Sequence, residues 1–229
     1  MISIKQKFIF THIGRTGGSS IELTLKDVGI KYMHTMKYSS QFSEYQHQND
    51  FIVDMFTDQE QYNAFMDRCA TLEFKHSQHW LSIEEQFVVG EDQYDEYFKF
   101  TFVRNPWDRL ASQYFGHVIQ KFPELDFNDF LIKALTEGTF EGDDYRFFAP
   151  SMHWITDEES DVMVDYIGRF ETLQDDFNII CDKIGLERRI LPQYGKSQKD
   201  GYKNYYTDQT AELVYDKFKS DIEAFNYEF

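Results

Sequence analysis

The stretch FIFTHIGRTGGSSI, residues 8–21, begins with an apolar run. The run is interrupted by a loop rich in glycine and hydroxyl residues, and apolar residues follow again. The pattern predicts a strand over residues 7–13, a loop over 14–19 and a helix after it. Because Gly17 and Gly18 have no Cβ, the loop backbone can approach an anion closely, and the N-terminus of the helix adds partial positive charge there. We therefore predict a phosphate-binding loop, with a tight turn that binds no ligand as the alternative.

Side chains of the same loop add hydrogen-bond donors and charge. Thr16, Ser19 and Ser20 carry hydroxyl groups, and Arg15 carries a fixed positive charge. A Walker A box would place a lysine directly after its second glycine, whereas a serine follows Gly18 here. The loop therefore argues against an ordinary ATPase or GTPase.

A second segment repeats this design in the sequence YFKFTFVRNPWDRLAS, residues 97–112. Its aromatic and β-branched residues predict a strand over 97–103. Asn105 is a natural N-cap and Pro106 suits the first helical position, so we expect a helix over 106–121. The apolar residues of this helix recur every four positions, at Leu110, Tyr114, Val118 and Phe122. Strand, loop and helix thus follow one another a second time.

Arg104 directly follows this second strand. Open α/β sheets bind ligands at the carboxyl ends of their strands, which makes Arg104 a candidate ligand-binding residue. The alternative is that Arg104 and Arg109 only pair with local carboxylates such as Asp108. Strands that alternate with helices indicate an α/β fold with a parallel sheet.

The remaining elements follow from the same rules. A short strand is expected near residues 72–76, and Ser82 and Glu85 fit a capping box at the start of a helix over 82–89. Another helix is expected at about 126–137. Asp208 is expected to cap a single last helix that packs on the sheet. The apolar residues of this last helix are Val214, Phe218, Ile222 and Phe225.

Composition limits the class of protein. A chain of 229 residues with 41% apolar residues can form a full core, so we predict one domain over residues 1–229. A net charge of −17 and a pI of about 4.7 argue against nucleic acid or an anionic membrane surface as the partner. The sequence shows no transmembrane run and no signal peptide, so we expect a cytoplasmic protein. Cys69 and Cys181 do not have the spacing of metal ligands, and no metal site is expected.

Taken together, the two segments resemble the sulfotransferases that use 3′-phosphoadenosine 5′-phosphosulfate (PAPS), in particular the carbohydrate O-sulfotransferase branch called sulfotransferase family 2. That branch typically reads HIPKTGGTS at the first loop, where this chain has HIGRTGGSS at residues 12–20. The family pattern FVRNP, an aromatic residue, then DRLxS is matched at every position by residues 102–112. Further similarity lies in residues 166–171, 196–197 and 205–229. The resemblance implies a P-loop-like three-layer α/β fold, with a central parallel sheet flanked by helices, in one sulfotransferase domain. Golgi members of the family carry a membrane anchor, which this sequence does not show, so we expect a bacterial or viral enzyme, with a shortened form of a longer chain as the alternative.

The resemblance also implies an activity, the transfer of the sulfuryl group from PAPS to an acceptor hydroxyl on a carbohydrate or glycan by in-line displacement. The product is then 3′-phosphoadenosine 5′-phosphate (PAP). The matched nucleotide-binding positions are Arg15, Thr16, Gly17, Gly18, Ser19, Ser20, Arg104, Ser112, Arg169, Lys196 and Ser197. Residues 17–20 are expected to hold the 5′-phosphosulfate, while Arg104 and Ser112 match ligands of the 3′-phosphate. Arg15 occupies the position of a family lysine that stabilises the leaving oxygen.

The transfer needs a general base, because an alcohol is almost undissociated at neutral pH. His76 is the first candidate, since related enzymes place a functional histidine before a helix in this region. Glu73 is an alternative base, and His79 could pair with His76 in a metal site, although no third ligand is in view. His12, at the end of the first strand, is expected to orient the loop.

Two departures from the family pattern keep other functions open. Gly14 replaces a proline that stiffens the loop, and Arg15 replaces the lysine. One alternative is therefore a catalytically degenerate fold that only binds nucleotide or sugar. A second alternative is a P-loop nucleotide kinase, although it would need the Walker lysine.

Overall fold

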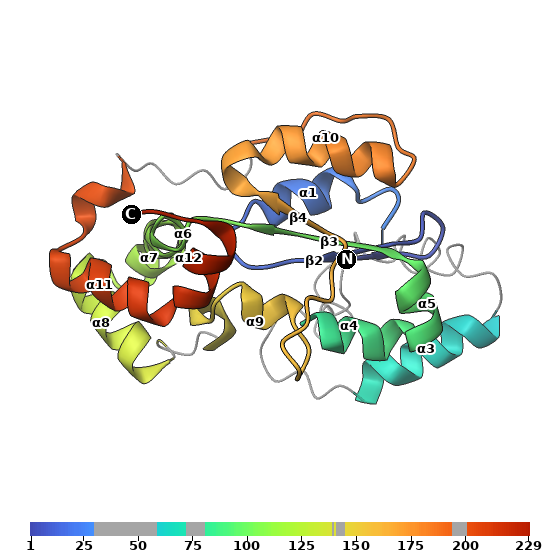
Figure 1. Cartoon of the computed structure of the whole chain (residues 1–229), viewed down its shortest axis with the longest axis horizontal. Helices are drawn as coiled ribbons and strands as arrows, with labels where there is room; N and C mark the ends of the chain where they lie inside the picture. The colour runs from blue at the N-terminus through green and yellow to red at the C-terminus, as the bar shows by residue number, and fades with distance from the viewer. Residues whose placement is uncertain (30–58, 72–80, 139, 141–144, 194–200) are drawn as a thin grey trace.

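The computed structural model describes residues 1–29, 59–71, 81–138, 140, 145–193 and 201–229 (Figure 1). Its centre is a sheet of four strands in the spatial order β1-β2-β3-β4. The strands are β1 (Ile2–Ser3), β2 (Phe8–Thr11), β3 (Phe98–Val103) and β4 (Tyr166–Arg169). The last three are parallel to one another, and β1 runs antiparallel at the edge. The predicted parallel sheet is therefore confirmed, and the strand expected near residues 72–76 lies outside the described residues.

The register brings the carboxyl ends of the parallel strands to one edge of the sheet. Thr11 pairs with Thr101, and Val103, two residues further along β3, pairs with Arg169. The loops that follow β2 and β3 therefore leave the sheet side by side. This is the edge at which open α/β sheets bind their ligands.

Alternating side chains of the strands build two separate apolar layers. Phe10 and Phe100 lie on one face, where they pack against α1 (Gly18–Thr24) and α10 (Leu173–Lys183). Ile9 points to the opposite face. The helices on that opposite face are α3 (Gln59–Thr71), α4 (Ser82–Val89) and α5 (Glu91–Glu96). Helices thus cover both faces of the sheet, as the three-layer fold requires (Figure 1).

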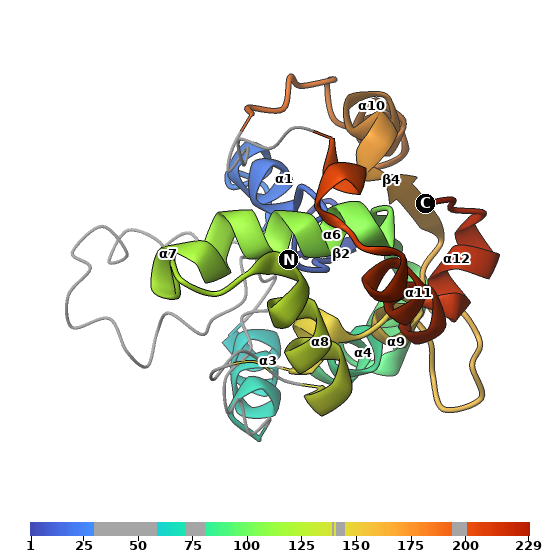
Figure 2. The same cartoon turned by 90° about the vertical axis from the view of Figure 1, so that its left-hand side faces the viewer.

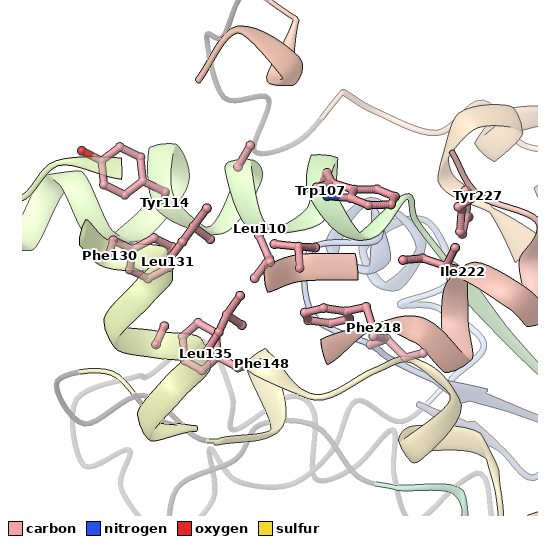
Figure 3. Close-up of a cluster of buried hydrophobic side chains, with 14 of the residues drawn as sticks. Trp107, Leu110, Tyr114, Phe130, Leu131, Leu135, Phe148, Phe218, Ile222 and Tyr227 are labelled. Carbon is pink, nitrogen blue, oxygen red and sulfur yellow. The ribbon is translucent and has the colours of Figure 1, made fainter. Parts of the chain in front are cut away.

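A third cluster lies beyond the carboxyl edge of the sheet and is built around the helix that follows β3. This helical run consists of α6 (Pro106–Gln113), a π-helix (Tyr114–Val118) and α7 (Ile119–Lys121), which follow one another in line (Figure 2). The other helices of this part are α8 (Phe127–Glu137), α9 (Met152–Ile155), α11 (Asp208–Lys217) and α12 (Lys219–Phe225). Trp107 and Leu110 of α6 face Phe218 and Ile222 within this cluster (Figure 3). Short 3₁₀-helices span Tyr145–Phe148, Phe170–Thr172 and Tyr202–Tyr205.

The helix starts confirm some predictions and correct others. The side chain of Asn105 accepts the N–H groups of Trp107 and Asp108, so this residue caps α6 as predicted. Helix α4 is capped one residue before the predicted serine, because Glu84 accepts the N–H of Leu81 at 2.7 Å. The described helices include none that is long and apolar enough to cross a membrane.

The prediction of a single last helix is wrong. The chain divides into α11 and α12 at Phe218, and the cap of α11 is Thr207, whose hydroxyl accepts the N–H of Thr210. Helix α11 packs against α6 and α8 in the third cluster. The helical spacing of the apolar residues continues across the break, which is why the sequence pattern did not reveal it.

Candidate functional site

The loop of residues 14–19, which we call the glycine loop, connects β2 to the start of α1. Buried side chains pack closely against its glycines. Gly17 has a φ of 89°, and a Cβ there would lie 2.9 Å from a methyl carbon of Leu173. A Cβ on Gly18 would lie 2.1 Å from the imidazole of His12. Neither position therefore accommodates a larger residue without rearrangement. The two glycines let the backbone follow this path, as the phosphate-loop prediction requires.

His12 lies on the interior side of the glycine loop, against Gly18. Its Nδ1 lies 2.9 Å from the carboxylate of Glu22 in α1, and its ring stacks on Phe10. The side chain is 5% exposed. His12 thus supports Gly18 from the interior of the protein.

The three hydroxyl residues of the loop occupy different environments. Thr16 is fully buried, and its hydroxyl donates to the carbonyl of Ile13 at 2.8 Å, so that group stabilises the loop itself. Ser19 is exposed, whereas Ser20 is buried in the first turn of α1. The prediction that these residues bind a nucleotide therefore rests on the Ser19 hydroxyl and on the backbone of residues 17–20.

Arg104 forms the local ion pair that the sequence offered as one alternative, while its role as a ligand-binding residue stays a prediction. Its Nε donates to Asp108 at 2.6 Å, and its Nη1 donates to the carbonyl of Arg15 at 3.0 Å. The guanidinium lies 3.7 Å from the centre of the Phe170 ring. The residue is 7% exposed, and this burial lowers the pKa of its guanidinium. Arg104 is thus an ion-pair partner of Asp108 and also joins the glycine loop to β3.

Arg15 reaches from the loop to the helix that follows β3. Its Nη2 donates to the hydroxyl of Ser112 at 2.9 Å and to the Ser112 carbonyl at 2.8 Å, and its Nε lies 3.2 Å from the same hydroxyl. Burial lowers the pKa of the Arg15 guanidinium to about 10, and the neighbouring charge of Arg104 adds to this effect. The structure therefore brings three predicted site residues together: Arg15, Arg104 and Ser112.

Arg109 is a structural residue of the site that the sequence analysis considered only as an ion-pair partner. It is 2% exposed and donates to the carbonyls of Gly14 at 3.1 Å, Ala149 at 3.0 Å and Phe147 at 3.3 Å. The ring of Phe147 packs so closely on Gly14 that a Cβ there would lie 2.7 Å from it. The glycine that replaces the family proline is thus held by a buried arginine and an aromatic ring. The DRL run at residues 108–110 was the only signal in the sequence for this structural role of Arg109.

Arg169 ends β4 and turns toward the C-terminal segment. Its Nη2 donates to the carbonyl of Phe225 at 2.6 Å, and its guanidinium lies 5.1 Å from the centre of the Tyr227 ring. The carboxylate of Glu171, two residues further along the chain, accepts the backbone N–H of Asn105 at 2.8 Å. A role of Arg169 in nucleotide binding stays a prediction.

Several predicted site residues lie outside the described residues. These are His76, Lys196 and Ser197, together with the alternatives Glu73 and His79. In the described part of the chain, no group of three or more histidine, cysteine, aspartate or glutamate side chains could hold a metal ion.

The described site has the chemistry of an anion-binding site. The guanidiniums of Arg15 and Arg104 lie beside the glycine loop, and the carboxylate of Asp108 contacts Arg104 directly. Charge-assisted hydrogen bonds from buried guanidiniums to phosphate are among the strongest that proteins make. The positive charge is local, since the chain as a whole carries −17.

Comparisons with known proteins identify several to which this sequence is similar. Carbohydrate sulfotransferase 10 of Xenopus laevis is 26% identical over 174 residues, which are 59% of this chain and 49% of that protein. Carbohydrate sulfotransferase 11 of Mus musculus is 26% identical over 166 residues, 57% of this chain and 47% of that protein. An uncharacterized protein of Archaeoglobus fulgidus is 29% identical over 117 residues, 50% of this chain and 90% of that protein.

The matches to the two carbohydrate sulfotransferases thus cover about half of each of those proteins. No solved structure matches the sequence. The profile of the sulfotransferase family matches residues 1–228, nearly the whole sequence. On this match, and with a glycine loop and two arginines at the carboxyl edge of its parallel sheet, the chain belongs to the sulfotransferase family.

Proposed function

We propose that this chain, acting as one domain, transfers the sulfuryl group of PAPS to a hydroxyl group of a carbohydrate and releases PAP. The observation that carries the proposal is the cluster of Arg15, Arg104 and Ser112 beside the glycine loop. This cluster can bind a phosphate group in addition to the one that the loop would hold. A carbohydrate acceptor is supported by the names of the relatives, two of which are carbohydrate sulfotransferases.

The nucleotide would span the two loops at the carboxyl edge of the sheet. The backbone of Gly17 and Gly18, with the hydroxyl of Ser19, would hold the 5′-phosphosulfate, because a glycine has no side chain of its own to keep an anion from the backbone N–H groups. Arg104 and Ser112 would bind the 3′-phosphate. Lys196 and Ser197 would complete the nucleotide site from the C-terminal part of the chain.

The reaction would be an in-line displacement at sulfur. The acceptor oxygen forms a bond to sulfur while the bond between sulfur and the bridging oxygen breaks, and PAP leaves with that electron pair. His76 would take the proton of the acceptor hydroxyl, because an imidazole is the side chain best suited to accept a proton near neutral pH. The protein's main contribution is to orient both substrates and to stabilise the charge on the leaving phosphate.

A nucleotide-binding experiment tests the proposal first. PAP, ATP and ADP are compared by isothermal titration calorimetry and by thermal unfolding, where a ligand at about 100 times its dissociation constant adds about 2.7 kcal/mol to the free energy of unfolding. We expect selective stabilisation by PAP. Transfer of labelled sulfate from PAPS to a panel of sugars then identifies the acceptor. A preference for ATP would refute the sulfotransferase activity and favour a nucleotide kinase, whereas PAP binding without transfer to any sugar would favour a protein that only binds.

A further inference from the structure

The side chain of Arg15 packs against Ser112 and Gly116 in the helical run after β3, and we call the space between these residues the Arg15 slot. Its guanidinium contacts Ser112 through two nitrogen atoms. It also lies against Gly116, where a Cβ would be 2.2 Å from Nη2. Gly116 belongs to the π-helix Tyr114–Val118, and such wider turns occur frequently at functional sites. The slot is therefore shaped by a glycine and a local change of helix type.

The charge around Arg15 is not balanced by the described residues. Asp108 pairs with Arg104, but Arg15 forms no ion pair with any carboxylate in the described part of the chain. The two guanidiniums lie close enough that the charge of Arg104 lowers the pKa of Arg15. An anion that contacts both guanidiniums would remove this repulsion, and in a site shielded from water its effect is larger than at the surface.

We propose that Arg15 is a ligand of the 3′-phosphate of the nucleotide, together with Arg104 and Ser112, and that it does not act at the leaving oxygen. This inference rests on the function proposed above. The planar guanidinium donates to Ser112 from both Nε and Nη2, which fixes its orientation in a way that a lysine ammonium cannot reproduce. Arg15 would thus determine specificity for nucleotides that carry a 3′-phosphate.

A comparison of PAP with adenosine 5′-monophosphate, which lacks the 3′-phosphate, separates the two roles of Arg15. We expect Arg15→Ala to raise the dissociation constant of PAP about tenfold or more, which is the usual effect of losing a charge-assisted hydrogen bond. The dissociation constant of the monophosphate should stay within about twofold of the wild-type value. Both affinities are measured by calorimetry. Equal losses for both nucleotides would place Arg15 at the 5′ side and overturn the proposal, as would an unchanged affinity for PAP.

The wild-type protein distinguishes failure of this inference from failure of the proposed function. If wild-type protein does not prefer PAP over adenosine 5′-monophosphate, the function itself is refuted. If it does, only the Arg15 variants decide. Arg188→Ala serves as the matched control, because Arg188 is an exposed arginine that pairs with Asp182, and we expect both affinities to be unchanged.

Gly116 provides an independent test that leaves Arg15 in place. A Gly116→Ala methyl group would displace the guanidinium, so we expect the same selective loss of PAP affinity. In the double variant Arg15→Ala with Gly116→Ala, the second substitution should cause no further loss. Additive losses would show that Gly116 acts separately from Arg15, and they would contradict the inference that Gly116 acts by making room for the Arg15 guanidinium. Arg15→Lys, which keeps the charge, covers the case in which Arg15→Ala fails to fold, and we expect it to lose PAP selectivity too.

Discussion

Glu85 in α4 predicts an unusual dependence of stability on pH. Its carboxyl group is fully buried below the end of β2, where it accepts the hydroxyl proton of Thr11, and Thr11 in turn contacts the hydroxyl of Ser82 at 3.1 Å. One oxygen of the carboxylate has no hydrogen-bond partner among the residues that the structure describes. Burial raises the pKa of Glu85 from 4.5 to about 7, against the opposing effects of the N-terminal ammonium group and of Thr11. The folded protein therefore holds a proton there that the unfolded chain releases.

The sign and size of the effect follow from linkage. Between pH 4.5 and about 7 the unfolded chain binds fewer protons at this position than the folded protein, so the free energy of unfolding falls as pH rises. Raising the pKa from 4.5 to about 7 corresponds to about 3 kcal/mol of stability, which is lost as the pH rises through about 7. Glu85→Gln mimics the protonated acid and does not titrate. Because the unfolded chain is already partly deprotonated at pH 5, the difference in stability between pH 5 and pH 8 should shrink by about 2.5 kcal/mol in this variant.

Urea denaturation at pH 5, 6, 7 and 8 measures this difference directly. Titrations of all other groups cancel when the curve of Glu85→Gln is subtracted from that of the wild type. Glu159→Gln, a change at an exposed glutamate, is the control and should run parallel to the wild type. If the two curves of wild type and Glu85→Gln also stay parallel within about 0.5 kcal/mol, the Glu85 carboxyl is not protonated in the folded protein and the reasoning is refuted.

Four further changes test the site and its scaffold. Arg104→Ala should lower PAP affinity at least about tenfold, measured by calorimetry, because it removes a buried charge-assisted contact, and an unchanged affinity would contradict its role. His76→Ala should lower turnover while PAP affinity stays within about twofold, whereas a parallel loss of both would indicate a structural histidine. Gly18→Ala should lower the melting temperature, because its methyl group would meet the ring of His12, and retention of wild-type stability would show that the loop can shift. Asn105→Ala should cost about 0.5–2 kcal/mol of unfolding free energy in a urea titration, and a smaller cost would mean that the cap of α6 is replaced by another group.

Features that depend on neighbouring residues were predictable from the sequence. The glycine loop and the Asn105-Pro106 start of α6 follow from backbone conformation and capping, and both are found where expected. Small displacements, such as the cap at Leu81 instead of Ser82, arise because a glutamate side chain can bond the N–H of the residue before the serine. Local rules thus located these elements and displaced the start of α4 by one residue, but they did not indicate β4, α10 or the break between α11 and α12.

Contacts between distant parts of the chain were not predictable in this way. The bond between Arg15 and Ser112 joins residues 97 positions apart, and neither motif alone indicates that the side chains meet. The resemblance suggested a role at the leaving oxygen for Arg15, whereas the direction of the side chain depends on the packing of α6 against the loop. The roles of His76 and Lys196 stay predictions, because these residues lie outside the described part of the chain.

The contacts of Arg109 have a thermodynamic consequence for the glycine loop. Because the Gly14 carbonyl is already bonded to this buried guanidinium, the loop loses its conformational freedom when the protein folds, and not when a ligand arrives. A nucleotide would then meet a preorganised loop, and more of its contact energy would appear as affinity. The buried cation beneath the loop thus transfers part of the entropic cost of recognition from the binding step to the folding of the chain.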